Sequence, residues 1–198
     1  MGHSQQDKAA SHDRVVRVAA ARFREAGLDG PAVAELMQEA GLTHGGFYRH
    51  FRSREDLVAE AVEHMRTQFE HGMAAAAENG FTGLINQYLT EAHRDSPATG
   101  CAVVAVGGDV ARSGERARAA YTHQVELYLE LIGELIGEPV GGVGGTADPA
   151  ARQRAVTTLS TMVGAMLIAR AVNSSELSQE FLDTVRGHLT GQAGERPA

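Results

Sequence analysis

The sequence has 198 residues, of which 43% are hydrophobic, so the chain can bury a core and does not have the composition of a disordered protein. A single cysteine, Cys101, excludes a disulfide within the chain, and no basic segment followed by an apolar one opens the sequence, so we expect a soluble cytoplasmic protein. The net charge is −7, but residues 1–54 carry +2 and the remainder carries −9. This asymmetry favours a polyanion as the partner of the N-terminal part.

Three helices are predicted in the N-terminal quarter of the chain. Apolar side chains recur at helical spacing over about 11–26, and a second helix is expected over about 32–40, ending at Gly41. A third is expected over about 44–50, with Thr43 as its N-cap. Two short helices joined by a tight turn that contains glycine are typical of a helix-turn-helix.

The rest of the sequence is also helical in pattern, because apolar residues recur three and four apart and alternating strand patterns are missing. Ser53-Arg54-Glu55-Asp56 predicts a capping box at the start of a fourth helix. The apolar repeat over 57–69 belongs to this fourth helix. Further helices are expected around 81–95, 101–106, 121–135, 150–172 and 175–189, with a glycine-rich loop over 138–149. We therefore predict an all-α fold of about nine helices, with three short N-terminal helices followed by a larger bundle.

The third predicted helix has the composition of a surface that meets DNA. Gly45 and Gly46 each cost about 1 kcal/mol in a helix relative to alanine, so a purely structural helix would not favour them. Without side chains at these positions, the backbone can approach a major groove closely. Hydrogen-bonding side chains are supplied by Thr43, His44, Tyr48 and His50, and phosphate-binding cations by Arg49, Arg52 and Arg54. The alternative is a short structural helix with an exposed polar face.

Residues 27–57 resemble the DNA-binding signature of the tetracycline-repressor (TetR) family. The family has a recognition helix of the type Gly-Val-Ser-Lys-Gly-Thr-Leu-Tyr-His-Tyr-Phe, and residues 41–51 read Gly-Leu-Thr-His-Gly-Gly-Phe-Tyr-Arg-His-Phe. Residues 52–57, Arg-Ser-Arg-Glu-Asp-Leu, match the family's Ser-Lys-Glu-x-Leu-type start of helix four. The sequence departs from the family at Pro31 and Ala32, where members often carry a Thr or Ser that caps helix two and contacts phosphate.

The resemblance implies roles by position. His44, Gly45 and Gly46 would contact bases, and Tyr48, His50 and Arg54 would contact phosphate. Because the two glycines leave few side chains to read bases, His44 and Thr43 would carry much of the direct readout, and binding could rely on DNA shape. The resemblance also implies a helix-turn-helix DNA-binding domain over 1–53 and a ligand-binding and dimerisation domain over 54–190. The tail over 191–198 is expected to be disordered.

By the same resemblance, the last two predicted helices would pair with their copies as a four-helix bundle. Apolar residues suited to this interface are Val156, Leu159, Val163, Met166, Leu167, Phe181, Val185 and Leu189. The alternative is that these stripes face the core of their own chain. By this resemblance we expect a dimeric regulator, a repressor, which binds a palindromic DNA operator and is released by a small-molecule effector. No enzyme activity, metal or cofactor is expected, since neither a Gly-x-Ser-x-Gly elbow nor a βαβ unit is present.

The effector site is open between two interpretations. A small organic molecule would occupy an apolar cavity, for which the candidate walls are Phe81, Ile85, Tyr88, Tyr121, Tyr128 and Met162, although each of them also suits a core. Residues 100–104 resemble a subgroup in which a cysteine follows a glycine near the start of helix six, and some relatives of that kind sense electrophiles or oxidants. A helix N-terminus would stabilise the thiolate of Cys101, whereas a lone cysteine in an apolar run is usually a core residue. A helical interaction protein without DNA binding is the alternative from another class.

Overall fold

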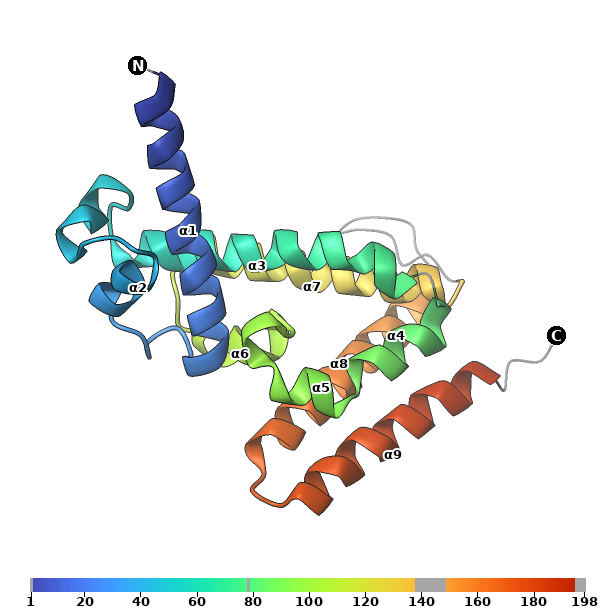
Figure 1. Ribbon diagram of the computed structural model, residues 1–198. Helices are drawn as coiled ribbons and strands as arrows, with labels where there is room; N and C mark the ends of the chain where they lie inside the picture. The colour runs from blue at the N-terminus through green and yellow to red at the C-terminus, as the bar shows by residue number, and fades with distance from the viewer. Residues whose placement is uncertain (1, 78, 138–148, 195–198) are drawn as a thin grey trace. The chain divides into compact units, whose positions relative to one another are not determined.

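The computed structural model describes residues 2–77, 79–137 and 149–194, and their regular secondary structure is entirely helical, as predicted (Figure 1). The N-terminal helices are α1 (Gly2–Ala26), α2 (Val33–Glu39), the 3-10 helix η1 (His44–Arg49) and α3 (Arg54–Ala77). They are followed by α4 (Gly80–Tyr88), α5 (Glu91–Asp95), the 3-10 helix η2 (Pro97–Thr99), α6 (Ala102–Val110) and α7 (Glu115–Leu135). The last helices are α8 (Pro149–Ala171) and α9 (Ser175–Gly194). No helix among these residues is both long enough and apolar enough to span a membrane.

Several helix boundaries lie where the sequence predicts them. Gly27 follows α1 with a φ of +78°, and Gly41 follows α2 with a φ of +73°, a backbone region that residues with a Cβ rarely adopt. The predicted cap of α3 is also present, because Ser53 Oγ accepts a hydrogen bond from the Asp56 backbone N–H at 3.1 Å. The carboxylate of Asp56 in turn accepts from the backbone N–H of Arg52, one residue before the position expected in a capping box.

Other boundaries differ from the prediction. Helix α1 begins at Gly2 instead of near residue 11, because the sequence before residue 11 carries no apolar stripe that could reveal a helix, and residues 5–10 are exposed. The stripe predicted over 81–95 is divided in two, since Thr90 caps α5 by accepting a hydrogen bond from the His93 backbone N–H. Helix α9 continues to Gly194, past the start of the expected tail. The predicted loop over 138–149 falls outside the described residues except for Pro149, which begins α8.

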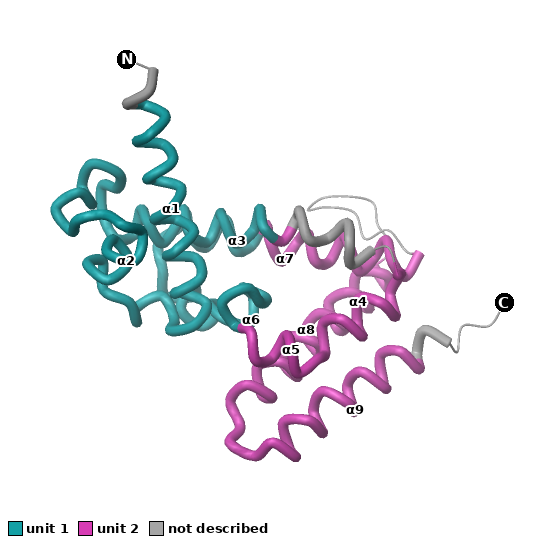
Figure 2. Tube along the Cα trace, in the orientation of Figure 1, with its two compact units in different colours: residues 1–68, 97–122 teal, residues 69–96, 123–198 magenta. Residues whose placement is uncertain are grey.

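The chain forms two compact units, which Figure 2 colours separately. Unit 1 comprises Met1–Gln68 and Pro97–Thr122, so it joins the N-terminal helices with α6 and the first turns of α7. Its core is built around side chains that are almost fully enclosed, among them Phe23, Leu36, Met37, Phe51, Leu57, Met65 and Val106. The boundary between the two units lies after Gln68, within α3. The boundary at residue 53 between a DNA-binding and a ligand-binding domain stays a prediction.

Unit 2 comprises Phe69–Ser96 and His123–Ala198 and contains α4, α5, α8 and α9. Its enclosed side chains include Ile85, Leu89, Ile132, Met162, Met166 and Leu182. Two arginines tie the short connections to the long helices. Arg170 of α8 donates to the backbone carbonyl oxygens of His93 and Arg94 at 2.7 and 3.1 Å, and Arg186 of α9 donates to that of Leu89 at 3.0 Å. These bonds satisfy carbonyl groups at helix ends that would otherwise lack partners.

Candidate nucleic-acid interface

The turn between α2 and η1 has the geometry of a tight helix-turn-helix connection. After Gly41 reverses the chain, the backbone N–H of Leu42 donates to the carbonyl oxygen of Met37 at 2.9 Å. Thr43 then adopts an extended conformation, with φ −81° and ψ 147°, and precedes η1 as its N-cap residue. Its side chain makes no cap hydrogen bond, so the predicted capping role is only positional.

The segment from Thr43 to His50 has a buried side and an exposed side. Phe47 is 3% exposed and stacks on Phe51 with ring centroids 5.4 Å apart, which attaches η1 to the core of unit 1. Tyr48 is 77% exposed, and Thr43 and His44 are also exposed. The 3-10 geometry of η1 differs from the α-helix that the sequence predicts, and it is consistent with two glycines in a six-residue segment.

The two glycines of η1 are not required by the fold. Neither Gly45 nor Gly46 has a positive φ. A Cβ added to Gly45 would meet nothing within 4 Å, and one added to Gly46 would approach Met37 Cε at 3.6 Å and Thr43 Oγ1 at 3.7 Å, which are ordinary contacts. Because the chain itself has room for side chains at both positions, their absence points to something outside the chain that approaches the backbone here.

Arg54 differs from the other predicted DNA-binding residues, because its guanidinium already has partners within the chain. It donates to the backbone carbonyl oxygens of Leu28 and Pro31 and lies 3.5 Å from the carboxylate of Asp29. It also lies over the ring of Phe23, 5.7 Å from the centroid. Arg54 therefore fastens the connection between α1 and α2 to the start of α3, and a phosphate contact would compete with these bonds.

The same connection is held from a second side by α6. Asp109 accepts a hydrogen bond from the backbone N–H of Leu28 at 2.9 Å, so the peptide groups on both sides of Leu28 are fixed by charged side chains. A Cβ on Gly27 would lie 2.8 Å from the Asp109 carboxylate, which makes this a close approach as well as a left-handed turn. Neither Asp109 nor the ion pair between Asp56 and Arg116 of α7 was found by the sequence reasoning, since partners so distant in sequence leave no local pattern.

A histidine pair lies where α1 meets η1 and α3. His12 Nε2 lies 2.6 Å from the carboxylate of Glu60, and its ring stacks on Phe51 with centroids 4.6 Å apart. The His12 ring centroid is 6.1 Å from that of His50. Burial lowers the pKa of His50, and the positive charges of His12, Lys8 and Arg49 lower it further. Lys8 was missed by the sequence reasoning because it lies before the expected start of α1, and His12 was missed because its partner Glu60 is 48 residues away in the sequence.

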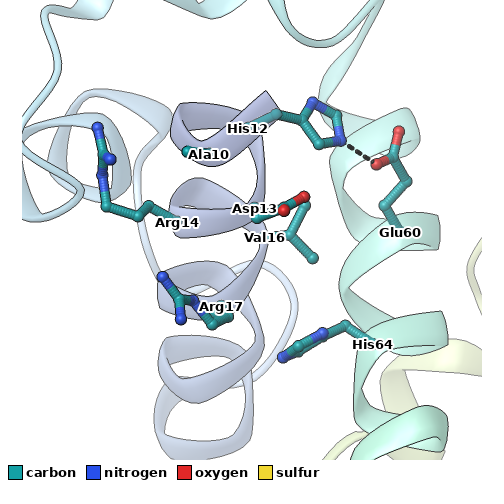
Figure 3. A pocket seen from close by; sticks show the side chains of 8 residues that line it. All are labelled: Ala10, His12, Asp13, Arg14, Val16, Arg17, Glu60 and His64. Carbon is teal, nitrogen blue, oxygen red and sulfur yellow. Dashed lines mark hydrogen bonds and ion pairs between the residues drawn. The ribbon is translucent and has the colours of Figure 1, made fainter. Parts of the chain in front are cut away.

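A groove runs between α1 and α3 in unit 1 (Figure 3). In the close-up, His12 and Glu60 meet across the groove, and His64 lies farther along α3. Burial, followed by the charges of Arg24 and Arg17, lowers the pKa of His64, while Asp13 raises it. The lining thus mixes both charge signs and does not favour an anion over a cation.

The predicted effector residues divide between the two units. Cys101 and Tyr121 belong to unit 1, where Cys101 is 6% exposed and is the N-cap residue of α6. Tyr121 donates to the backbone carbonyl oxygen of Val103 at 3.1 Å, and burial is the main cause that raises its pKa. The others are in unit 2, where Phe81 is half-buried and Ile85, Tyr88, Tyr128 and Met162 are buried.

The predicted dimerisation residues also separate by burial. Leu159, Met166 and Leu189 are at most 6% exposed and therefore serve the core of their own chain. Val163, Phe181 and Val185 are half-buried. Val156 and Leu167 are 43% and 52% exposed, and the neighbouring Ile168 is 38% exposed, so α8 presents a row of uncovered apolar side chains.

Comparison with known proteins agrees with this geometry. Residues 15–61 match the family model described as bacterial regulatory proteins of the tetR family. The chain is 28% identical over 164 residues to an HTH-type transcriptional regulator of Mycobacterium tuberculosis, covering 80% of this chain and 83% of that protein. It is 33% identical over 54 residues to the HTH-type transcriptional repressor KstR2 of Mycolicibacterium smegmatis, covering 27% of this chain and 26% of the repressor.

Solved structures show the same fold. A TetR transcriptional regulator from Chloroflexus aurantiacus superimposes with a TM-score of 0.77 at 21% identity, over 96% of this chain and 98% of that one. The reduced form of NemR from E. coli superimposes with a TM-score of 0.71 at 18% identity, over 91% and 95% of the two chains. The helix-turn-helix region thus matches the tetR family model in sequence, and the chain shares the fold of a solved TetR transcriptional regulator.

Proposed function

We propose that this protein is a homodimeric repressor that acts in the cytoplasm, binds a palindromic operator through η1 and is released by a small-molecule effector. The observation that carries the DNA-binding step is the glycine pair of η1, which the fold does not require and which lets the backbone approach a major groove. Around this pair, Thr43, His44 and Tyr48 are exposed and offer hydrogen-bonding groups to bases and phosphates.

The dimeric state is supported by the exposed apolar row of Val156, Leu167 and Ile168 on α8. A two-fold dimer covers such a row with its own copy, because the same surface occurs on both subunits. Two copies of η1 would then enter successive major grooves, and the operator would share the two-fold symmetry of the protein. Half-buried Phe181 and Val185 of α9 extend the apolar surface available to a partner.

Repression and effector release complete the proposal. KstR2, which is similar to this chain over 54 residues, is described as a repressor, and a dimer on an operator can block polymerase. An effector can release the operator only if it binds the two conformations of the protein with different affinities. The aromatic and apolar residues of unit 2, such as Tyr88, Tyr128 and Met162, are the proposed surroundings of an apolar effector.

Selection from random DNA duplexes tests this function. We expect the purified protein to enrich a palindrome, with an affinity that falls steeply as salt increases. His44→Ala should relax the preference at one position of each half-site, because a base contact contributes about 1–3 kcal/mol of discrimination. His123→Ala, which removes an exposed histidine of α7, is the matched control and should select the same palindrome as the wild type. Weak binding without enrichment and without salt dependence would instead identify a helical interaction protein.

Thiol sensing through Cys101 is the second candidate for the release step. It is supported by the position of Cys101 as the N-cap residue of α6. Because the side chain is only 6% exposed, a reagent would have to gain access as the start of α6 opens. Under this hypothesis N-ethylmaleimide releases the operator from the wild type and leaves Cys101→Ser bound. Retention of the operator by both proteins assigns release to a small molecule.

A further inference from the structure

The helical extension at the start of α1 carries a cation to the edge of η1. Lys8 is exposed and lies one helical turn before His12 on α1, and the ring centroid of His12 is 6.1 Å from that of His50. Burial and the charge of His12 lower the pKa of His50, and the charge of Lys8 adds to this effect. Arg49 flanks the same ring from η1 and is also exposed. Neither Lys8 nor Arg49 has a hydrogen-bond or ion-pair partner within the part of the chain that the structure describes. Two uncompensated cations therefore border one histidine.

His50, which both cations border, is packed against two rings, but its hydrogen-bonding capacity is not used within the described residues. His50 lies 6.1 Å from the ring of His12 and 6.2 Å from the ring of Phe51, between centroids. Its Nδ1 is buried without a hydrogen-bond partner among the described residues, which leaves Nε2 as the nitrogen that can meet an acceptor from outside. The nearby carboxylate, that of Glu60 on α3, is occupied by His12 at 2.6 Å.

We propose that Lys8, Arg49 and His50 together hold one phosphate of the DNA backbone, so that the extended first turns of α1 form a DNA contact beside η1. An oxyanion satisfies all three groups at once, since each offers a donor and two carry a full positive charge. This inference rests on the proposed function, because the phosphate belongs to the operator that η1 binds. It adds a segment, the first turns of α1, that lies outside the helix-turn-helix and outside residues 15–61 matched by the family model.

A unique feature of the sequence makes the contact measurable. Lys8 is the only lysine in the chain, so an amine-acylating reagent can modify only its ε-amino group and the α-amino group of the chain. We expect the selected operator duplex to protect Lys8 from acetylation by acetic anhydride, as measured by mass spectrometry of the peptide that contains it. A duplex of scrambled sequence, at a concentration too low for binding, serves as the reference. Equal acetylation of Lys8 in free and operator-bound protein would overturn the proposal.

Salt dependence gives a second measurement. Each phosphate contact contributes about 0.9 to the slope of log affinity against log salt, which corresponds to about a fivefold change in affinity at 0.15 M salt. Lys8→Ala should therefore lower the slope by about one for each protomer and weaken binding to all sequences alike. Lys8→Arg should restore both values, whereas Arg118→Ala, which removes an exposed cation from α7, should change neither. An unchanged slope in Lys8→Ala would contradict the contact.

The role of His50 is tested by pH. Burial, followed by the charges of His12, Lys8 and Arg49, keeps the pKa of His50 low in the free protein, and the negative phosphate would raise it in the complex. Binding then takes up a proton, so affinity should rise as the pH falls from 7.5 to 6.0, by at most about tenfold for each unit by which the pKa rises. His50→Gln should remove this part of the pH dependence. If His50→Gln retains the wild-type profile, the protonation belongs to another histidine, such as His44, and His50 is not part of the phosphate site.

These measurements separate the two proposals. Absence of operator binding by the wild type at any salt concentration would contradict the proposed function, and the phosphate contact with it. Tight, sequence-specific binding with Lys8 still open to acetylation would leave the proposed function intact and overturn the α1 contact alone.

Discussion

Arg54→Ala is expected to lower the free energy of unfolding by about 2–4 kcal/mol, because charge-assisted hydrogen bonds contribute about 1.5–3 kcal/mol and their loss leaves backbone carbonyl groups without donors. The carbonyl oxygens concerned are those of Leu28 and Pro31, in the connection between α1 and α2. The ion pair with Asp29 adds little, since the Asp29 side chain is 92% exposed. Urea denaturation followed by circular dichroism measures the change.

Arg54→Lys distinguishes this structural role from the phosphate contact that the family resemblance implies. A lysine keeps the positive charge but has no planar fork to reach two carbonyl oxygens, so it should recover only a small part of the lost stability. A phosphate contact would tolerate lysine, which the family usually carries at this position. Wild-type stability in Arg54→Lys, with a loss of DNA affinity only in Arg54→Ala, would therefore contradict the structural role.

The neighbouring Arg52 supplies the matched control for this experiment. Its side chain is exposed and has no hydrogen-bond or ion-pair partner in the described parts of the chain. Arg52→Ala should change the free energy of unfolding by less than about 0.5 kcal/mol, as expected for a surface substitution. A large loss of stability in Arg52→Ala would show that the region is sensitive to any loss of charge.

Features with local causes could be predicted from the sequence. Gly27 and Gly41 end their helices because a left-handed residue is needed there, and the apolar spacing on either side locates α1 and α2. The first turns of α1 escaped prediction because residues 5–10 are exposed and no apolar periodicity marks this part of the sequence. The hydrogen bond from the Leu28 backbone N–H to Asp109 could not be predicted for another reason. Asp109 lies 81 residues away in the sequence, and no spacing rule connects such positions.

The burial of apolar residues on α8 shows that a sequence pattern does not always distinguish core positions from surface positions. Leu159 and Met166 face the core, and Val156 and Leu167 face outward, yet all four belong to apolar stripes at helical spacing. A helix that is apolar on two sides gives no periodic signal to separate its core from its interface. The same limit applied to the candidate cavity walls, because Tyr121 and Tyr128 were proposed together although they belong to different compact units.

Leu167→Glu is expected to dissociate the proposed dimer. Leu167 is 52% exposed and lies three helical turns from Val156, so both side chains lie on one face of α8. Exposed apolar side chains on one face of a folded protein mark an interaction surface more often than scattered single residues do. A carboxylate at position 167 would be buried without a partner in the dimer, at a cost of about 2–4 kcal/mol for an interface residue that matters.

That cost corresponds to a dimer dissociation constant about 30-fold to 1,000-fold higher, which sedimentation equilibrium can measure. Operator affinity should fall with it, because a single protomer contacts one half-site only. Leu167→Met keeps the apolar volume and should leave both measurements near the wild type. If Leu167→Glu remains a dimer and still binds the operator, this face of α8 is not the interface. The half-buried face of α9 around Phe181 would then have to bring the two copies of η1 together.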